Sequence, residues 1–225
     1  MEKRVGVLLS GCGVFDGSEI HEAVLTLLAL DRHDAHIVCA APDIPQMHVV
    51  NHMTTEETSD ARNVLIESAR IARGRIIDLK DLAIDHIDAL ILPGGYGAVK
   101  NLSDFAVKGP QAGIQADVIR ILQQMLAAGK PIGAICIAPA VLVRALAMHS
   151  PEVTIGEDSE TAAAIETMGG RHVPCRVDQI HVDARLKIVT TPSYMVASRI
   201  KDVAAGIEKL VREVLSLVDQ TNENL

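Results

Sequence analysis

Cys136 has the surroundings of a nucleophile, because it lies where a short apolar run gives way to a helical pattern. Residues 131–135 contain a glycine among apolar residues and predict a buried strand. From Ile137 onward apolar residues recur at helical spacing, and Pro139 falls in the first turn, where its missing N–H costs little. A sharp turn of this kind strains the backbone and lifts the side chain off the carboxyl end of a sheet. The helix N-terminus further predicts a thiol pKa below the ordinary value, whereas the alternative is a small hydrophobic residue that closes a core strand.

Three carboxylates near the start of the first predicted helix could serve as its partner: Asp16, Glu19 and Glu22. Glu19 and Glu22 are three residues apart and share a helix face, so we expect only one of them to point into the sheet's crevice. Burial against a thiol would raise the pKa of that carboxyl and let the two groups exchange a proton. The alternative is that all three carboxylates only complement the helix dipole.

The pair Gly94-Gly95 follows a predicted strand and offers backbone N–H groups to a ligand, since neither residue carries a Cβ. Together with the N–H of Ile137, these N–H groups could form an oxyanion hole beside the Cys136 sulfur. The alternative is a simple tight turn. The glycines lack the Lys-Ser/Thr of a phosphate loop, and the loop at residues 11–17 lacks the third glycine of a dinucleotide fingerprint, so no cofactor is predicted.

The histidines are weaker candidates for a site around Cys136. None follows Cys136 directly, and His172 and His181 are candidates only because they lie near the later strands in the sequence. We expect them to be ordinary polar histidines. No spacing of His, Asp, Glu and Cys predicts a metal site.

These residues must be positioned by an alternation of strands and helices. Predicted strands lie at 4–10, 36–41, 75–79, 87–92 and 131–135, with shorter extended pieces at 152–155, 181–182 and 187–191. Predicted helices lie at 19–32, 59–72, 115–128, 160–168 and 195–217, with one more after Cys136. The alternation predicts an α/β fold, a mostly parallel sheet with helices on both faces, in one domain of residues 1–225 whose tail from 219 is frayed. Ligands of such sheets gather at the carboxyl ends of the strands.

Charge and composition limit the classes of binding partner and the location that the sequence predicts. The net charge is −8 without a lysine or arginine cluster, which disfavours a nucleic-acid or membrane surface. Four cysteines lie without C-x-x-C spacing, which predicts free thiols. The sequence shows no charged-then-apolar leader and no apolar run of membrane-spanning length, so we expect a cytoplasmic protein.

The motifs, taken together, resemble a known family. Five features appear in order, namely the strand RVGVLLS, Glu22 in GSEIHEAVLTLLALD, ILPGG, AAGKPIGAICIAPA and VTTPSYM. They are similar to the PfpI-type branch of the class I glutamine-amidotransferase-like superfamily, and within it to the ElbB-type glyoxalase-like proteins. The resemblance implies a flavodoxin-like fold, Cys136 on a nucleophile elbow, Glu22 hydrogen-bonded to it, an oxyanion hole from the amides of Gly95 and Ile137, and a homodimer.

Two departures from the family pattern shape the expected activity. Relatives place a histidine directly after the cysteine or on the strand after the elbow helix, where this chain has Ile137 and Gly156. A Cys-His-acid triad is therefore incomplete, which argues against protease, amidase or amidotransferase chemistry. We expect a slow, cofactor-independent glyoxalase, a lyase that converts glyoxal to glycolate through a Cys136 hemithioacetal. The alternatives are a redox sensor or protective interaction protein with an oxidisable Cys136, and a scaffold that has lost its activity.

Overall fold

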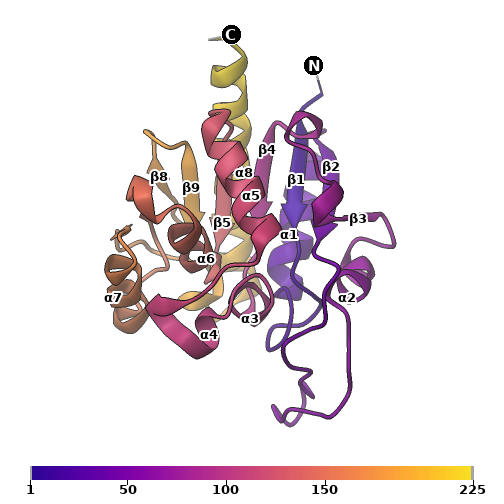
Figure 1. Cartoon of the computed structure of the whole chain (residues 1–225). Coiled ribbons are helices and arrows are strands. Elements are labelled where there is room, and N and C mark those ends of the chain that lie inside the picture. The colour runs from indigo at the N-terminus through magenta and orange to yellow at the C-terminus, as the bar shows by residue number, and fades with distance from the viewer. Residues whose placement is uncertain (1, 224–225) are drawn as a thin grey trace.

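A mostly parallel sheet forms the centre of the molecule. The computed structural model describes residues 2–223, and within them seven strands pair in the order β3-β2-β1-β4-β5-β9-β8 (Figure 1). The last strand, β8, runs antiparallel to β9, and every other pairing in this sheet is parallel. The strands are β1 (Arg4–Leu8), β2 (His36–Ala41), β3 (Ile76–Asp78), β4 (Ala89–Leu92), β5 (Ile132–Ile135), β8 (His181–Asp183) and β9 (Ile188–Thr191). A separate short pair joins β6 (Glu152–Val153) to β7 (Arg171–His172).

The central strands are apolar because both of their faces are covered. All residues of β4, β5 and β9 are buried, which is the pattern of parallel strands between two helical layers. Gly133 in β5 matters for this packing, since a Cβ there would lie 3.0 Å from Leu210 Cδ2. The glycine therefore lets the C-terminal helix approach the middle of the sheet closely.

Helices cover both faces, as the alternation predicted. Helices α3, α5 and α6 pack on one face with α4 and α7 beyond them, and α1, α2 and α8 pack on the other (Figure 1). Their bounds are α1 (Ile20–Arg32), α2 (Val64–Ile71), α3 (Tyr96–Lys100), α4 (Phe105–Lys108), α5 (Ala116–Ala127), α6 (Ala138–Ala145), α7 (Ser159–Thr167) and α8 (Ile200–Glu223). Among residues 2–223 no helix is both long and apolar enough to cross a membrane.

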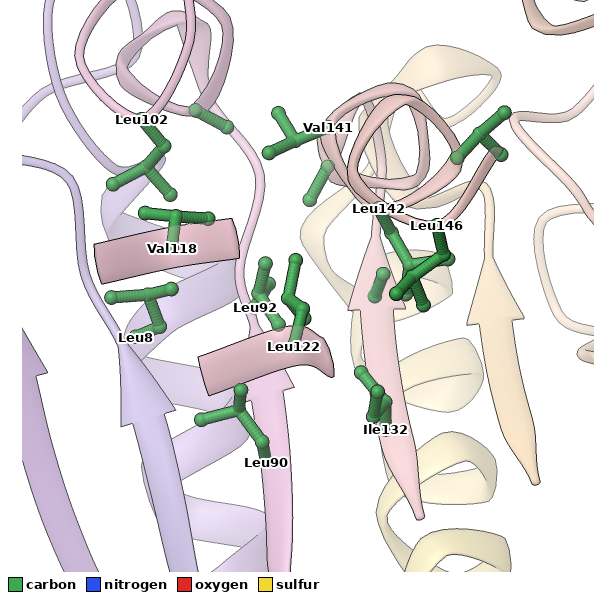
Figure 2. Close-up of a cluster of buried hydrophobic side chains, with 14 of the residues drawn as sticks. Leu8, Leu90, Leu92, Leu102, Val118, Leu122, Ile132, Val141, Leu142 and Leu146 are labelled. Carbon is green, nitrogen blue, oxygen red and sulfur yellow. The ribbon is translucent and has the colours of Figure 1, made fainter. Parts of the chain in front are cut away.

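One hydrophobic layer lies between the sheet and helices α5 and α6. Figure 2 shows Leu90 and Leu92 of the sheet facing Leu122 of α5, with Leu142 of α6 beside Ile132. These side chains are fully buried, and each such aliphatic side chain contributes about 1.5–3 kcal/mol relative to an exposed one. The layer fixes the positions of β4 and β5, whose carboxyl ends carry the glycine pair and the cysteine.

Three predicted helix boundaries were wrong by more than one helical turn, and one of them is the start of α8, which begins at Ile200 and not at residue 195. The helix expected from residue 59 begins only at Val64, because Asn63 caps it by accepting a hydrogen bond from Ile66 N. At the other end, α8 continues to Glu223, so the tail expected to fray from residue 219 is helical as far as the structure describes it; residues 224 and 225 lie outside the described part. Lys187 Nζ donates to Thr221 Oγ1 at 2.7 Å, and this contact holds the last turns of the helix against the sheet.

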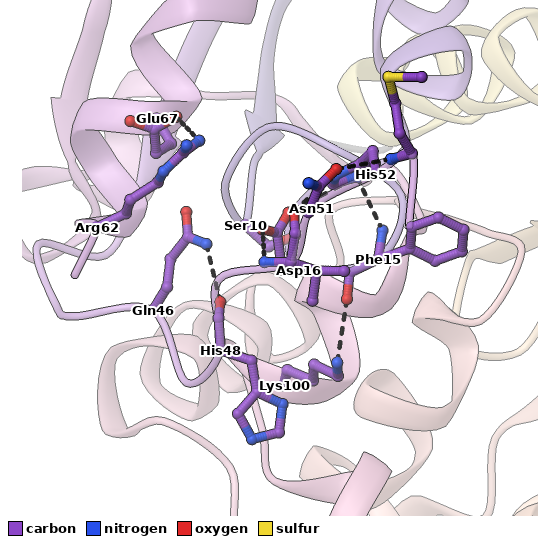
Figure 3. Close-up of polar contacts among 12 residues, drawn as sticks. Ser10, Phe15, Asp16, Gln46, His48, Asn51, His52, Arg62, Glu67 and Lys100 are labelled. Carbon is purple, nitrogen blue, oxygen red and sulfur yellow. Dashed lines mark hydrogen bonds and ion pairs between the residues drawn. The ribbon is translucent and has the colours of Figure 1, made fainter. Parts of the chain in front are cut away.

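Residues 42–63, between β2 and α2, form a surface excursion that extends below the sheet in Figure 1. It is fixed to the loop after β1 (Figure 3), where Val50 N donates to Asp16 Oδ2 at 2.8 Å and Phe15 N donates to His52 Nε2 at 3.3 Å. Asp16 is almost completely buried. Its carboxylate therefore anchors the excursion and is not a partner of the cysteine.

Candidate active site

Cys136 lies on a strained elbow between β5 and α6. Its φ is +60°, in the left-handed region that costs a residue with a Cβ about 1–2 kcal/mol. Cys136 N donates to Thr191 O at 3.0 Å, so the end of β9 supports the turn from the neighbouring strand. The side chain is only 8% exposed. The structure thus has the sharp strand-to-helix turn that the change of periodicity predicted.

The loops after β1 and β4 pack against each other beside this elbow. Glu19 N donates to Gly94 O at 2.9 Å, and Gly97 N donates to Gly17 O at 2.8 Å. These backbone bonds place the first turn of α1 next to the glycine pair. Three carboxyl ends of parallel strands therefore converge, as expected for the ligand-binding edge of such a sheet.

Glu22 is the carboxylate that reaches the cysteine. It is fully buried in the first turn of α1, where the Cys136 thiol donates a hydrogen bond to it. Its Oε2 accepts from Gly94 N at 3.0 Å, and its Oε1 accepts from Ser193 Oγ at 2.6 Å and from Tyr194 N at 3.4 Å. These three hydrogen bonds hold the Glu22 carboxyl group in place beside Cys136.

Glu19 also lines the cavity beside Cys136, so the expectation that only one of the two carboxylates would enter the crevice is wrong, although it is Glu22 that interacts with the sulfur. Glu19 caps α1 through Oε2, which accepts from Glu22 N at 2.7 Å. Glu19 is nevertheless close enough for its charge to raise the pKa of Glu22.

The cysteine and the glutamate titrate as a pair, and both hold their protons more tightly than in water. Burial raises the pKa of Glu22 to about 7, the charge of Glu19 adds to this, and the hydrogen bonds to Glu22 oppose it. Burial also raises the pKa of the Cys136 thiol well above its ordinary value, assisted by the nearby Glu22. The lowered thiol pKa expected from the helix N-terminus is therefore wrong, because desolvation outweighs the helix. Near neutral pH the pair carries at most one negative charge, and a thiolate forms only while the carboxyl holds the proton.

Gly94 and Gly95 are both required by this geometry. A Cβ on Gly94 would lie 2.5 Å from Cys136 Cβ and 2.6 Å from Glu22 Oε2, so the glycine is what allows those two side chains to meet. Gly95 has a φ of +94°, and its N–H and that of Ile137 lie close enough to the Cys136 sulfur to oppose the rise in the thiol pKa. The two amides proposed for an oxyanion hole thus converge on the nucleophile.

A cavity of about 460 Å³ opens above the sulfur. Three aromatic and three acidic side chains lie in its wall, although aromatic residues make up only 2% of the chain. Pro139, in the first turn of α6, is buried and does not line the cavity. The lining residues that bear on the chemistry are Glu19, Gly95, Tyr96, Phe105, Cys136, Ile137, Asp158, Glu160, Thr161 and Tyr194.

The histidines singled out by their positions lie elsewhere. His172 belongs to β7, and His181 in β8 faces Glu152, with 3.3 Å between Nε2 and Oε2. No histidine is among the described residues that line the cavity. Within residues 2–223, no group of three or more His, Cys, Asp and Glu side chains is arranged to hold a metal ion.

Sequence reasoning missed Ser193 and Tyr194, which both contact Glu22. They form a short 3-10 helix, Ser193–Met195, directly after β9, and Ser193 has a φ of +48°. The motif VTTPSYM contains both residues. Its role could not be inferred from periodicity, because nothing local in the sequence shows that β9 lies beside β5.

Comparison with known proteins identifies close relatives. The sequence model of the DJ-1/PfpI family matches residues 12–193. The human protein named glutamine amidotransferase-like class 1 domain-containing protein 3, mitochondrial, is 46% identical, and the alignment covers 95% of this chain and 83% of that protein. The ES1 protein homolog, mitochondrial, of Rattus norvegicus is 44% identical over 95% of this chain and 84% of its own length. A crystal structure from Ehrlichia chaffeensis, described as an isoprenoid biosynthesis protein with amidotransferase-like domain, has a TM-score of 0.89 and 38% identity over 95% of this chain and 99% of that chain.

These relatives correct one expectation. Both curated proteins are named as mitochondrial, which contradicts the cytoplasmic location inferred from the sequence. The missing leader pattern could not decide the location, because a targeting segment is separate from the folded domain.

Proposed function

The chain belongs to the DJ-1/PfpI family, and we propose that it is a glutathione-independent glyoxalase that converts glyoxal to glycolate through a hemithioacetal on Cys136. The observation that carries the proposal is the fully buried Glu22 carboxyl, which accepts the thiol hydrogen bond and has a pKa raised to about 7. A base with such a pKa exists in both protonation states near neutral pH and can both accept and return a proton.

The reaction begins with addition of the Cys136 sulfur to one carbonyl carbon. The S–C bond forms, and the thiol proton moves through Glu22 to the carbonyl oxygen, whose developing charge faces the amides of Gly95 and Ile137. The Glu22 carboxylate then removes the hydrogen of the carbon bound to sulfur and delivers it to the second carbon. The first carbon is oxidised and the second reduced, so no external oxidant is needed. Water hydrolyses the resulting thioester to glycolate and the free thiol.

Two features set the expected rate and the choice of substrate. Without a histidine in the cavity wall as described, general acid–base help worth about a hundredfold or more is partly absent, and turnover should be slow. Glyoxal offers two unhindered aldehydes, whereas methylglyoxal presents a bulkier ketone at the carbon that must accept the proton. The proposed preference is therefore for glyoxal, with weak activity or none on methylglyoxal and no need for glutathione or a metal.

A second candidate function is redox sensing, and the two N–H groups that converge on the sulfur favour it. Hydrogen peroxide would oxidise Cys136 to a sulfenate and, with a second equivalent, to a sulfinate whose oxygens these amides and protonated Glu22 would bind. The raised thiol pKa counts against this reading, because oxidation requires the thiolate. The glyoxalase route avoids the difficulty, since Glu22 removes the thiol proton as the S–C bond forms.

The test is carbon-13 NMR of labelled glyoxal incubated with wild type, Cys136→Ala and the matched control Cys175→Ala. Cys175 is also a free thiol but lies outside the cavity wall. Labelled glycolate should form with wild type and Cys175→Ala and be absent with Cys136→Ala. If wild type yields no more glycolate than Cys136→Ala, the sensor replaces the enzyme; if activity depends on added thiol or is lost with a chelator, the covalent mechanism is wrong.

A further inference from the structure

Tyr194 is placed by the same turn that fixes Glu22. Its backbone N lies 3.4 Å from Glu22 Oε1, and the preceding residue, Ser193, donates to the same oxygen. The Tyr194 side chain lines the cavity together with the Cys136 sulfur. A phenol is therefore held beside the thiol and carboxyl pair by the end of a buried strand, and not by a mobile loop.

His21 contacts the phenol from the solvent side. It directly precedes Glu22 in α1, and its Nδ1 lies 2.7 Å from the Tyr194 hydroxyl in a hydrogen bond that joins the two side chains. The ring centroids are 5.9 Å apart. The His21 side chain is 53% exposed, so it connects the cavity wall to water. One helical turn thus supplies both the buried carboxyl at the sulfur and an imidazole behind the phenol.

The proposed reaction needs a proton donor that Glu22 cannot supply. While Glu22 removes the hydrogen from the first carbon, the oxygen on the second carbon changes from a carbonyl to a hydroxyl and requires a proton at that moment. Burial raises the pKa of Tyr194, and the charges of Glu19 and Glu22 add to this, so the phenol keeps its proton near neutral pH. The phenol is therefore suited to donate a proton in this step and not to accept one.

We propose that Tyr194 is the catalytic acid of this site and that His21 is its positioning residue; the proposal rests on the glyoxalase function above. Tyr194 donates its proton to the oxygen of the second carbon as Glu22 takes the hydrogen from the first, which gives an enediol. Glu22 then protonates the second carbon, the hydroxyl on the first carbon returns its proton to the Tyr194 phenolate, and the thioester carbonyl forms. Protons balance within the site, and no co-reactant is consumed.

His21 acts on the phenol through the hydrogen bond to its oxygen. With hydrogen on Nδ1, the imidazole donates to that oxygen, leaves the phenol hydrogen free for the substrate and stabilises the phenolate that remains. The pair thus occupies the role that a triad histidine has in relatives. It reaches the cavity from α1 and β9 and not from the elbow helix.

Two other hydroxyl groups line the cavity, Tyr96 and Thr161, but neither is placed like Tyr194. Tyr96 lies on α3 with the ammonium of Lys100 5.6 Å from its ring centre, and Thr161 lies on α7. Neither side chain forms a described hydrogen bond to a histidine or contacts Glu22. Tyr96 is therefore a matched control, since it carries the same phenol in the same cavity.

The experiment compares Tyr194→Phe, His21→Gln, the double variant and Tyr96→Phe. We expect turnover of glyoxal to fall about a hundredfold in Tyr194→Phe, the usual scale of one lost acid. Loss of one hydrogen bond should lower it about tenfold in His21→Gln. The double variant should resemble Tyr194→Phe alone, because His21 acts only through the phenol. Tyr96→Phe, which removes a phenol from the same cavity wall, should lose much less turnover than Tyr194→Phe.

Two further readouts separate catalysis from structure. Alkylation of Cys136 by iodoacetamide should be unchanged in Tyr194→Phe, and the kinetic isotope effect with dideuterated glyoxal should be at least as large as in wild type, because hydrogen transfer is slowed specifically. A structural role would instead lower alkylation or diminish the isotope effect. Additive losses in the double variant, or equal losses in Tyr194→Phe and Tyr96→Phe, would overturn the proposal. If wild type itself forms no glycolate, the glyoxalase function fails and this role with it; normal glycolate formation by Tyr194→Phe overturns the role alone.

Discussion

Replacing Glu22 by glutamine should remove a pH dependence from the stability of the fold. The pKa of Glu22 rises from 4.5 to about 7 on folding, a difference of 2.5 units. At about 1.4 kcal/mol per unit, this corresponds to about 3 kcal/mol. The folded state binds the proton more tightly than the unfolded state, so the stabilisation is fully present below pH 4.5 and is lost as the pH rises through about 7. Glutamine is neutral throughout and has no such step.

The measurement is the free energy of unfolding from urea titrations between pH 4.5 and pH 8.5, taken as the difference between Glu22→Gln and wild type. That difference should increase in favour of the variant by about 3 kcal/mol across the range and level off above pH 8. Glu19→Gln is the control, because it keeps the buried carboxyl but removes a charge that raises its pKa, which moves the step to lower pH. Parallel curves for wild type and Glu22→Gln would show that Glu22 is ionised at neutral pH, and the proton-transfer reasoning would fail.

Other substitutions and probes test the packing, the titration and the charge of the site. Gly94→Ala should abolish glycolate formation and lower stability by about 1–3 kcal/mol, because its Cβ would lie within 2.6 Å of both reacting side chains; wild-type activity would show that the pair tolerates separation. The rate of Cys136 alkylation should still be rising with pH at pH 9, since burial raises the thiol pKa, and a plateau below pH 8 would contradict this. Iodoacetamide should react with Cys136 faster than iodoacetate by more than the ratio seen with a free thiol, because the cavity wall is acidic. Glu160→Gln should bring the ratio of the iodoacetamide rate to the iodoacetate rate closer to that of a free thiol, because Glu160 lines the cavity. Glu166 is exposed on the same helix, and Glu166→Gln should leave the ratio unchanged. A wild-type ratio equal to that of the free thiol would refute the electrostatic argument.

The sequence allowed the elbow and the sheet to be predicted because their signals are local. The change from a strand to a helix around Cys136 and the glycine pair at Gly94 each involve only neighbouring residues, whereas the choice of Glu22 came from the resemblance to the family. Parallel strands then bring these loops together, since their carboxyl ends share one edge. Periodicity does not report which way a helix faces, and Pro139 at the start of α6 is buried.

The remaining features depend on contacts between distant segments. Ser193 meets Glu22 across 171 residues, and only the order of β5 and β9 in the sheet makes that contact possible. The thiol pKa was also predicted from a local effect, the helix N-terminus. Burial by three separate loops has the larger influence and reverses the sign. The possible homodimer stays a prediction.

The raised pKa values and the strained elbow are destabilising features concentrated at one point. The φ of Cys136 costs about 1–2 kcal/mol and the ionisation of buried Glu22 about 3 kcal/mol at neutral pH, which together are a large fraction of the stability of a typical domain. The cost is tolerable because β5 is packed on both faces, against α6 on one side and α8 on the other. The same packing keeps the thiol and the carboxyl in contact when either loses its proton, since neither side chain can move to solvent. A base near pKa 7 that is held against a nucleophile by the core, and not by a flexible loop, is therefore a direct consequence of placing the elbow on a central strand.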